Sequence, residues 1–119
     1  MDTQHIPKTE EETYAGIMRA SRVMDYDSIM IFATNCIGLG MLRDNYGRNS
    51  PDYKRVRSSV ENSLFLSTAR TCFEQISHYK KTFHDAPENN VEKSNKLEKL
   101  CRGILEGAER CLSPVPSMP

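Results

Sequence analysis

The sequence predicts an all-α fold, a four-helix, mostly antiparallel bundle with one long helix. Apolar residues recur every three or four positions along most of the chain, which is the spacing of one buried helix face. Short stretches rich in Asp, Asn, Gly and Pro separate these segments. The chain has 119 residues, 38% of them hydrophobic, and its 16 basic residues balance 16 acidic ones, which argues against disorder. We therefore expect a single helical domain over 1–112 and a flexible tail over 113–119.

The first helix is expected to begin at Glu10. Thr9 and Glu12 have the spacing of a capping box, in which each side chain bonds the other residue's backbone N–H. Three carboxylates in the first turn also suit the positive end of the helix dipole. The apolar positions that follow share one face and are Tyr14, Ile17, Met18 and Met24.

A second helix is predicted from Ile29 to about Arg43, capped by Asp27 or Ser28. Its apolar residues lie all round it, so it is either central or faces a second subunit. It is shorter than the roughly 20 apolar residues that span a bilayer. Its two glycines, Gly38 and Gly40, indicate that a neighbouring backbone approaches closely. An alternative is one long helix that includes the first and bends at 25–27.

The third helix is predicted to run unbroken from Pro51 to Phe83. Gly47 can take a positive φ in the preceding turn, and Ser50 is the expected N-cap. A second capping box, Ser58 with Glu61, would start the helix later, but apolar residues continue through this region and favour one helix. A heptad seam follows, formed by Phe65, Ala69, Cys72, Ile76, Tyr79 and Phe83.

A break at 84–90 precedes a fourth helix, which has one apolar face and ends at Leu112. Its charged residues include Glu92 and Lys96, a favourable pair four positions apart. The last seven residues contain three prolines, which is typical of a polyproline-like tail.

We expect no catalytic site, no cofactor and no metal. The four cysteines form no C-x-x-C pair, and they are predicted to be reduced, buried, structural thiols. Glu74 and His78 could donate two metal ligands from one helix face, but two ligands do not make a site. The polar N-terminus does not resemble a signal peptide, so a cytoplasmic location is predicted, bacterial or in a host cytosol. The cysteines are Cys36, Cys72, Cys101 and Cys111.

The segment 43–57 is predicted to bind a partner. It holds five basic residues against two acidic ones and two tyrosines, whereas residues 1–27 hold six acidic residues against three basic ones. Tyr and Arg are frequent anchors of protein interfaces. Alternatively, the two charge excesses compensate each other across the folded surface. The candidate partner-binding residues are Arg43, Tyr46, Arg48, Tyr53, Arg55 and Arg57.

With its capped acidic start, Tyr/Arg-rich first long loop and Pro-ended tail, the chain resembles the small Legionella metaeffectors that inhibit the ubiquitin deamidases MavC and MvcA. The resemblance implies a non-catalytic inhibitor that occludes a larger enzyme. We therefore expect a protein-binding regulator that also forms a homodimer through the second helix or the exposed part of the third. Neither nucleic acid nor a membrane is an expected partner. The alternatives are a small cysteine-dependent enzyme and a weak nucleic-acid-binding protein.

Overall fold

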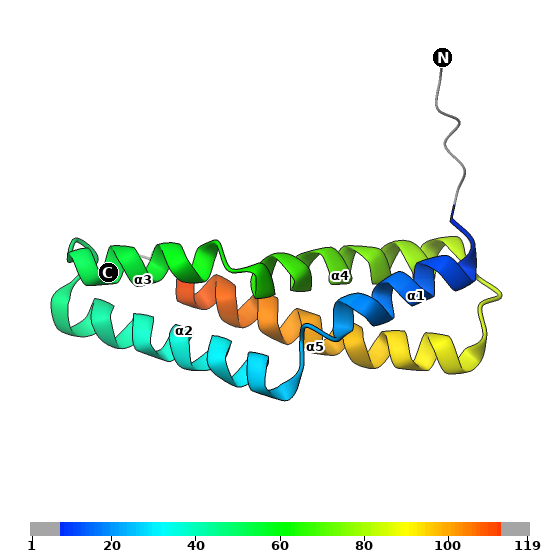
Figure 1. The fold of residues 1–119 in the computed structure, drawn as a ribbon, viewed down its shortest axis with the longest axis horizontal. Coiled ribbons are helices and arrows are strands. Elements are labelled where there is room, and N and C mark those ends of the chain that lie inside the picture. The colour runs from blue at the N-terminus through cyan, green and yellow to red at the C-terminus, as the bar shows by residue number, and fades with distance from the viewer. Residues whose placement is uncertain (1–7, 113–119) are drawn as a thin grey trace, which may run out of the picture.

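The computed structural model describes residues 8–112, which form five α-helices and no strand, so the all-α class is confirmed (Figure 1). None of these helices is both long and apolar enough to cross a membrane. The tail predicted over 113–119 lies outside the described residues. The helices are α1 (Glu10–Ser21), α2 (Tyr26–Tyr46), α3 (Pro51–Glu61), α4 (Leu64–Thr82) and α5 (Glu88–Leu112).

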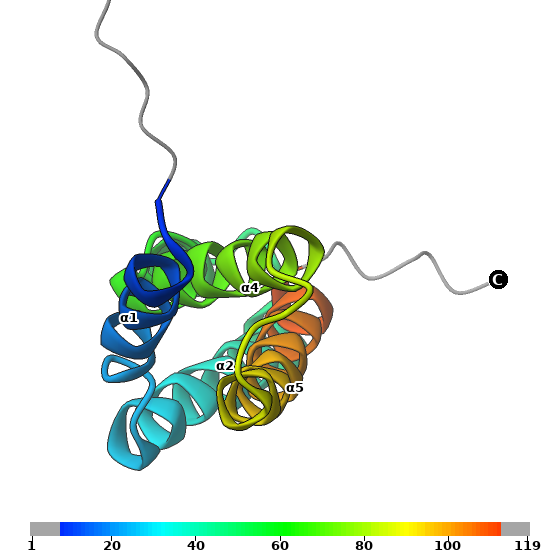
Figure 2. The same cartoon turned by 90° about the vertical axis from the view of Figure 1, so that its right-hand side faces the viewer.

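The helices are arranged as three long rows. The first two helices, α1 and α2, follow one another in one direction, α3 and α4 return in the opposite direction, and α5 runs back alongside them (Figure 1). At one end α1, α4 and α5 pack together, and at the other end α2 packs against α3 and α5 (Figure 2). Only α5 therefore extends through both halves of the molecule.

The helix predicted to be continuous from Pro51 to Phe83 is interrupted, and this prediction was wrong. The interruption lies at Asn62 and Ser63, where Asn62 leaves the helical conformation with φ −97° and ψ 12°. The hydroxyl of Ser63 accepts a hydrogen bond from the N–H of Leu66 at 3.1 Å and caps α4. The later start at Ser58 was also wrong, because that residue lies inside α3. Short polar side chains compete for backbone bonds, so the Asn-Ser pair ends one helix and starts the next.

The capping predictions for α1 and α3 are confirmed. Thr9 Oγ1 accepts from the N–H of Glu12 at 3.1 Å, and the Glu12 carboxylate accepts from the N–H of Thr9 at 3.2 Å. The hydroxyl of Ser50 accepts from the N–H of Tyr53 at 3.1 Å. Before it, Gly47 has the predicted positive φ of 80°.

The start of α2 differs from the prediction. Asp25, rather than Asp27 or Ser28, is the N-cap, and its carboxylate accepts from the N–H of Ser28 at 2.8 Å. The carboxylate therefore starts α2 at Tyr26, and α1 and α2 are separate helices instead of one bent helix. The longer α2 ends at Tyr46, beside the candidate partner-binding segment.

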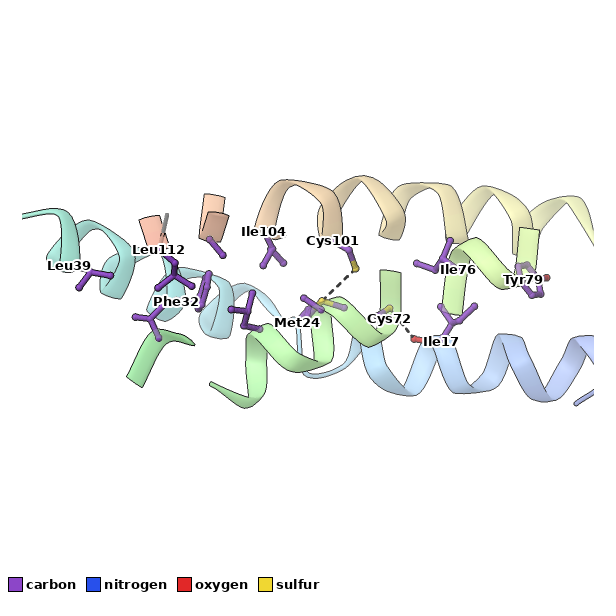
Figure 3. Packing of buried hydrophobic residues seen from close by; sticks show 14 of the residues in the cluster. Ile17, Met24, Phe32, Leu39, Cys72, Ile76, Tyr79, Cys101, Ile104 and Leu112 are labelled. Atoms are coloured by element: carbon purple, nitrogen blue, oxygen red, sulfur yellow. Dashed lines mark hydrogen bonds between the residues drawn. The ribbon is translucent and has the colours of Figure 1, made fainter. Parts of the chain in front are cut away.

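The core follows the predicted heptad seam of α4, with one shift. Leu66, rather than Phe65, is fully buried at the start of the seam, and Ala69, Cys72, Ile76 and Tyr79 continue it. The opposing helices and the connection between α1 and α2 supply further buried side chains, which line the interior (Figure 3). They include Ile17, Met24, Phe32, Leu39, Cys101, Ile104 and Leu112.

Candidate partner-binding surface

The predicted partner-binding residues surround the corner at which α2 turns into α3, at one end of the molecule (Figure 1). The N–H of Gly47 donates to the carbonyl of Arg43 at 2.9 Å and closes α2. The N–H of Ser50 then donates to the carbonyl of Gly47 at 3.3 Å, and α3 begins at the next residue. We call this region, residues 43–57, the basic corner.

Two of the six predicted residues are exposed at the basic corner, and a third is half-buried there. Tyr46, the last residue of α2, is 68% exposed. Arg48 is half-buried in the turn, and no ion pair among the described residues involves it. Arg55 is exposed and forms an ion pair with Asp52 at 2.8 Å. The end of α2, the turn and the start of α3 thus bring one aromatic ring and two guanidinium groups to the same corner.

The other three predicted residues have structural contacts. Tyr53 is only 4% exposed and belongs to the core, so its ring is not available at the surface. Arg57 donates to the carbonyl of Leu112 at 2.7 Å, at the C-terminus of α5, and pairs with Glu61 at 2.9 Å. A cation at a helix C-terminus is stabilised by the helix dipole. Arg43 pairs with the neighbouring Asp44 at 3.2 Å, and its side chain is mostly buried.

The basic corner is far from the acidic start of α1. The carboxylate of Glu10 accepts a hydrogen bond from Tyr79, near the far end of the α3–α4 row (Figure 1). At a rise of 1.5 Å per residue, the two helices place Pro51 and Tyr79 about 40 Å apart. The Debye length at physiological salt is about 8 Å, so the two charge excesses are screened from each other. Among the described residues, the positive charge of the basic corner is offset only by the ion pairs of Arg43, Arg55 and Arg57.

The four cysteines are free thiols in two groups. Cys72 and Cys101 are buried in the core, where the Cys101 sulfur donates to Met24 Sδ at 3.8 Å (Figure 3). The adjacent Cys101 thiol and burial raise the pKa of Cys72 above its ordinary value. Cys36 and Cys111 are half-buried, so burial of all four thiols was not fully correct. Burial raises the pKa of Cys36 to about 12, which disfavours the reactive thiolate.

A polar cluster that the sequence analysis missed joins three helices. Tyr79 on α4 donates to a carboxylate oxygen of Glu10 on α1, and Asn90 on α5 donates to the same oxygen at 3.1 Å. We call these three residues the polar latch. Burial, followed by the nearby carboxylate, raises the pKa of Tyr79 to about 12. In the sequence, Tyr79 fits an apolar seam and Glu10 fits a helix start, so nothing there links the two.

A second exposed feature is the apolar face of α2. Met30 is 47% exposed, Ile37 66% and Met41 59%. Beside this face, α2 and α5 border an open groove of about 410 Å³ that includes Gly103 and Gly107. A close backbone neighbour was predicted at Gly38 and Gly40, but this was wrong within one chain. A Cβ at the first would meet nothing within 4 Å, and at the second only the Arg43 guanidinium at 3.9 Å.

Comparisons with models of protein families, with curated proteins and with solved structures found no match for this chain.

Proposed function

We propose that the protein is a non-catalytic regulator that binds a larger enzyme through the basic corner and inhibits it. The carrying observation is the 68% exposure of Tyr46 at the end of α2, next to Arg48 and Arg55. A large aromatic ring on the surface of a helix end contributes nothing to the core. Tyr and Arg are enriched among the residues that dominate binding energy at protein interfaces.

The charge of the corner favours an acidic protein surface as the partner. The ion pair between Arg55 and Asp52 is highly exposed, with 76% and 61% of the side chains accessible. Such pairs contribute only about 0–1 kcal/mol, so a partner carboxylate can replace Asp52 at little cost. Lys54 is exposed beside Arg55 and adds a further positive charge. Nucleic acid is a weaker candidate, because the chain has no net charge and binding would depend on few phosphate contacts.

A cysteine-dependent enzyme is less well supported than a binding protein. A cysteine nucleophile needs an accessible thiol with a lowered pKa. Cys36 is half-buried, and its pKa is raised to about 12. Cys72 is fully buried, and its pKa is raised as well. The Cys72 thiol lowers the pKa of Cys101, but Cys101 is fully buried, so its sulfur is not accessible to a substrate. The environments of these three cysteines are those of structural thiols.

The resemblance to the Legionella metaeffectors extends the proposal to a ubiquitin deamidase as the inhibited enzyme, in the bacterial or host cytosol. Binding would occlude the face of the enzyme that receives its substrate. The direct probes are therefore purified MavC and MvcA. Calorimetric titration should give a 1:1 complex, and the protein should stop deamidation of ubiquitin at stoichiometric concentration.

The test of the basic corner uses a triple variant, Tyr46→Ala with Arg48→Ala and Arg55→Ala. We expect at least a 100-fold loss of affinity, since one anchor residue alone accounts for about 2 kcal/mol or more. The control replaces two exposed lysines at the other end of the molecule, Lys81→Ala with Lys93→Ala. Helicity by circular dichroism should be unchanged in both. Equal affinity of the triple variant and the control would refute the role of the corner.

If neither deamidase binds, the choice of enzyme is wrong, while the corner can still be tested. The tagged protein is purified from its native cell, and a co-purifying enzyme in fixed ratio is titrated with the same variants. The triple variant should lose this enzyme and the lysine control should retain it.

A further inference from the structure

The exposed apolar face of α2 has the spacing of a coiled-coil seam. Its members alternate steps of four and three residues, which keeps them on one side of a helix. Phe32 and Leu39 point into the core, and at 100° per residue Met30 and Ile37 lie about 140–180° away from them. No other helix among residues 8–112 covers this side. The seam positions are Tyr26, Met30, Ala33, Ile37, Gly40 and Asp44.

We propose that two copies of this chain associate through this seam, with their α2 helices antiparallel. The two-fold axis passes next to position 35, so each seam residue of one copy lies opposite a different seam residue of the second copy. This gives three kinds of residue pair across the interface. Met30 of one copy lies opposite Gly40 of the second copy, and Ala33 lies opposite Ile37 of the second copy. In these layers a large side chain meets a small one, so the helices can approach closely without overlap.

The outermost layer of this arrangement is polar and also complementary. Tyr26 of one copy lies opposite Asp44 of the second copy, and a phenol can donate a hydrogen bond to a carboxylate. Tyr26 is 74% exposed in the single chain, where no hydrogen bond among the described residues involves its hydroxyl. In the dimer, the Tyr26 hydroxyl would therefore have a carboxylate acceptor at each end of the seam.

A parallel pairing would lack this complementarity. Each residue would meet its own copy, so Asp44 would lie against a second Asp44 and two carboxylates would repel each other. Gly40 against Gly40 would leave a gap next to the bulkier Ile37 layer. Isologous two-fold contacts are the commonest way for a soluble protein to self-associate. Both orientations are isologous, but only the antiparallel one avoids the contact between two Asp44 carboxylates and pairs each large seam residue with a small one.

The groove beside the seam provides room for the second helix. Gly103 and Gly107 are one turn apart on α5, and an added Cβ at either would meet nothing within 4 Å. Together with Leu100, which is 37% exposed, and with Lys99 and Ile104, they form the α5 wall of the groove. A helix that packs on the α2 seam can thus extend over α5 and cover more apolar surface. This arrangement gives a role to Gly40 on α2 and to Gly103 and Gly107 on α5.

The surface is large enough for a specific dimer. A fully exposed large side chain presents roughly 150–250 Å². The exposed parts of Tyr26, Met30 and Ile37 on the seam, and of Met41 beside it, therefore supply roughly 500 Å² per copy. Two copies therefore bury about 1,000 Å² before the groove is counted, which is the lower limit for a biological interface. A patch of this size is also near the upper limit of what monomers leave exposed.

Analytical ultracentrifugation of the full chain tests the dimer without any partner. The wild type should sediment as a dimer at micromolar concentration, and Ile37→Asp should sediment as a monomer with unchanged helicity. The matched control is Ile31→Asp, on the same helix and 63% exposed against 66% for Ile37, but about 120° away around the axis. It should remain a dimer. A monomeric wild type at 100 µM, or equal dissociation by both variants, would overturn the proposal.

The orientation is tested by mixing two variants that are each monomeric alone. Ala33→Glu and Ile37→Lys should associate on mixing, because the antiparallel register places the two new charges opposite each other. The register would be refuted if the mixture stayed monomeric, or if the only complex formed were one variant paired with itself. Because the readout is the mass of the chain alone, a failed dimer test leaves the proposal for the basic corner unaffected.

Discussion

Removal of one hydroxyl from the polar latch should measurably destabilise the protein. In the variant Tyr79→Phe, the ring keeps its place in the core, but Glu10 loses the hydrogen bond that joins α4 to α1. Hydrogen bonds to a charged group contribute about 1.5–3 kcal/mol. At about 4 °C per kcal/mol, the lower value corresponds to a fall in Tm of roughly 6 °C. Urea unfolding followed by circular dichroism measures the change directly.

The matched control is Tyr14→Phe, since the ring of Tyr14 lies 6.1 Å from that of Tyr79 but belongs to a residue with no hydrogen-bonded hydroxyl among the described contacts. Its free energy of unfolding should change by less than about 0.5 kcal/mol. A double-mutant cycle with Glu10→Ala should give a coupling energy of about 1 kcal/mol or more between the two latch residues. Additive effects of the two substitutions would refute the latch.

The latch also predicts a pH dependence with a definite sign. The pKa of Tyr79 is raised from 10 to about 12, so the folded state holds the phenol proton more tightly than the unfolded chain does. The resulting stability is complete below pH 10 and is lost as the pH rises toward 12. The wild type should therefore lose more stability than Tyr79→Phe between pH 10 and pH 12. Parallel stability curves for the two proteins in this window would contradict the assignment.

Three further substitutions or labels test the remaining structural claims. Ser94→Ala should raise the free energy of unfolding by about 0.5–1 kcal/mol, because the buried Ser94 hydroxyl has no hydrogen-bond partner among residues 8–112; a loss of stability in urea would contradict this. Ser63→Ala should cost about 1 kcal/mol, since α4 loses its N-cap; thermal unfolding at unchanged Tm would refute the capping role. Cys36 should react slowly with a thiol-directed reagent at pH 8 in the native protein and quickly in urea, because its pKa is raised to about 12; fast native labelling would instead favour the cysteine enzyme.

Local signals in the sequence were sufficient for most of the fold. The capping box of Thr9 and Glu12, the Ser50 cap and the apolar period of α4 depend only on residues within a turn or two of each other. The break at Ser63 was missed because apolar residues on both sides keep the same period while a short polar pair interrupts the backbone. A regular apolar spacing can thus continue across a helix break, so the spacing alone does not reveal the N-cap residue.

The site was harder to predict, because charge and residue type do not show which side of a helix faces inward. Tyr53 and Arg57 have the same composition signal as Tyr46 and Arg55. Tyr53 is buried in the core, and Arg57 caps a helix that ends more than 50 positions later in the chain. Only the tertiary contacts separate anchors of the fold from residues available to a partner. The exposed Tyr46 and Arg55, together with the half-buried Arg48, are what remains of the predicted patch.

The all-round apolarity of α2 had two possible explanations, a central position or a second subunit. A central helix is excluded, because Ile37 is 66% exposed while Phe32 and Leu39 on the other side are buried. Its core side accounts for half of its apolar residues. The outward-facing Tyr26, Met30 and Ile37, with the flanking Met41, would expose roughly 500 Å² per chain in a single copy, near the upper limit for monomers. A second copy covers this surface and leaves the two basic corners at opposite ends of the pair, so that each can bind its own partner.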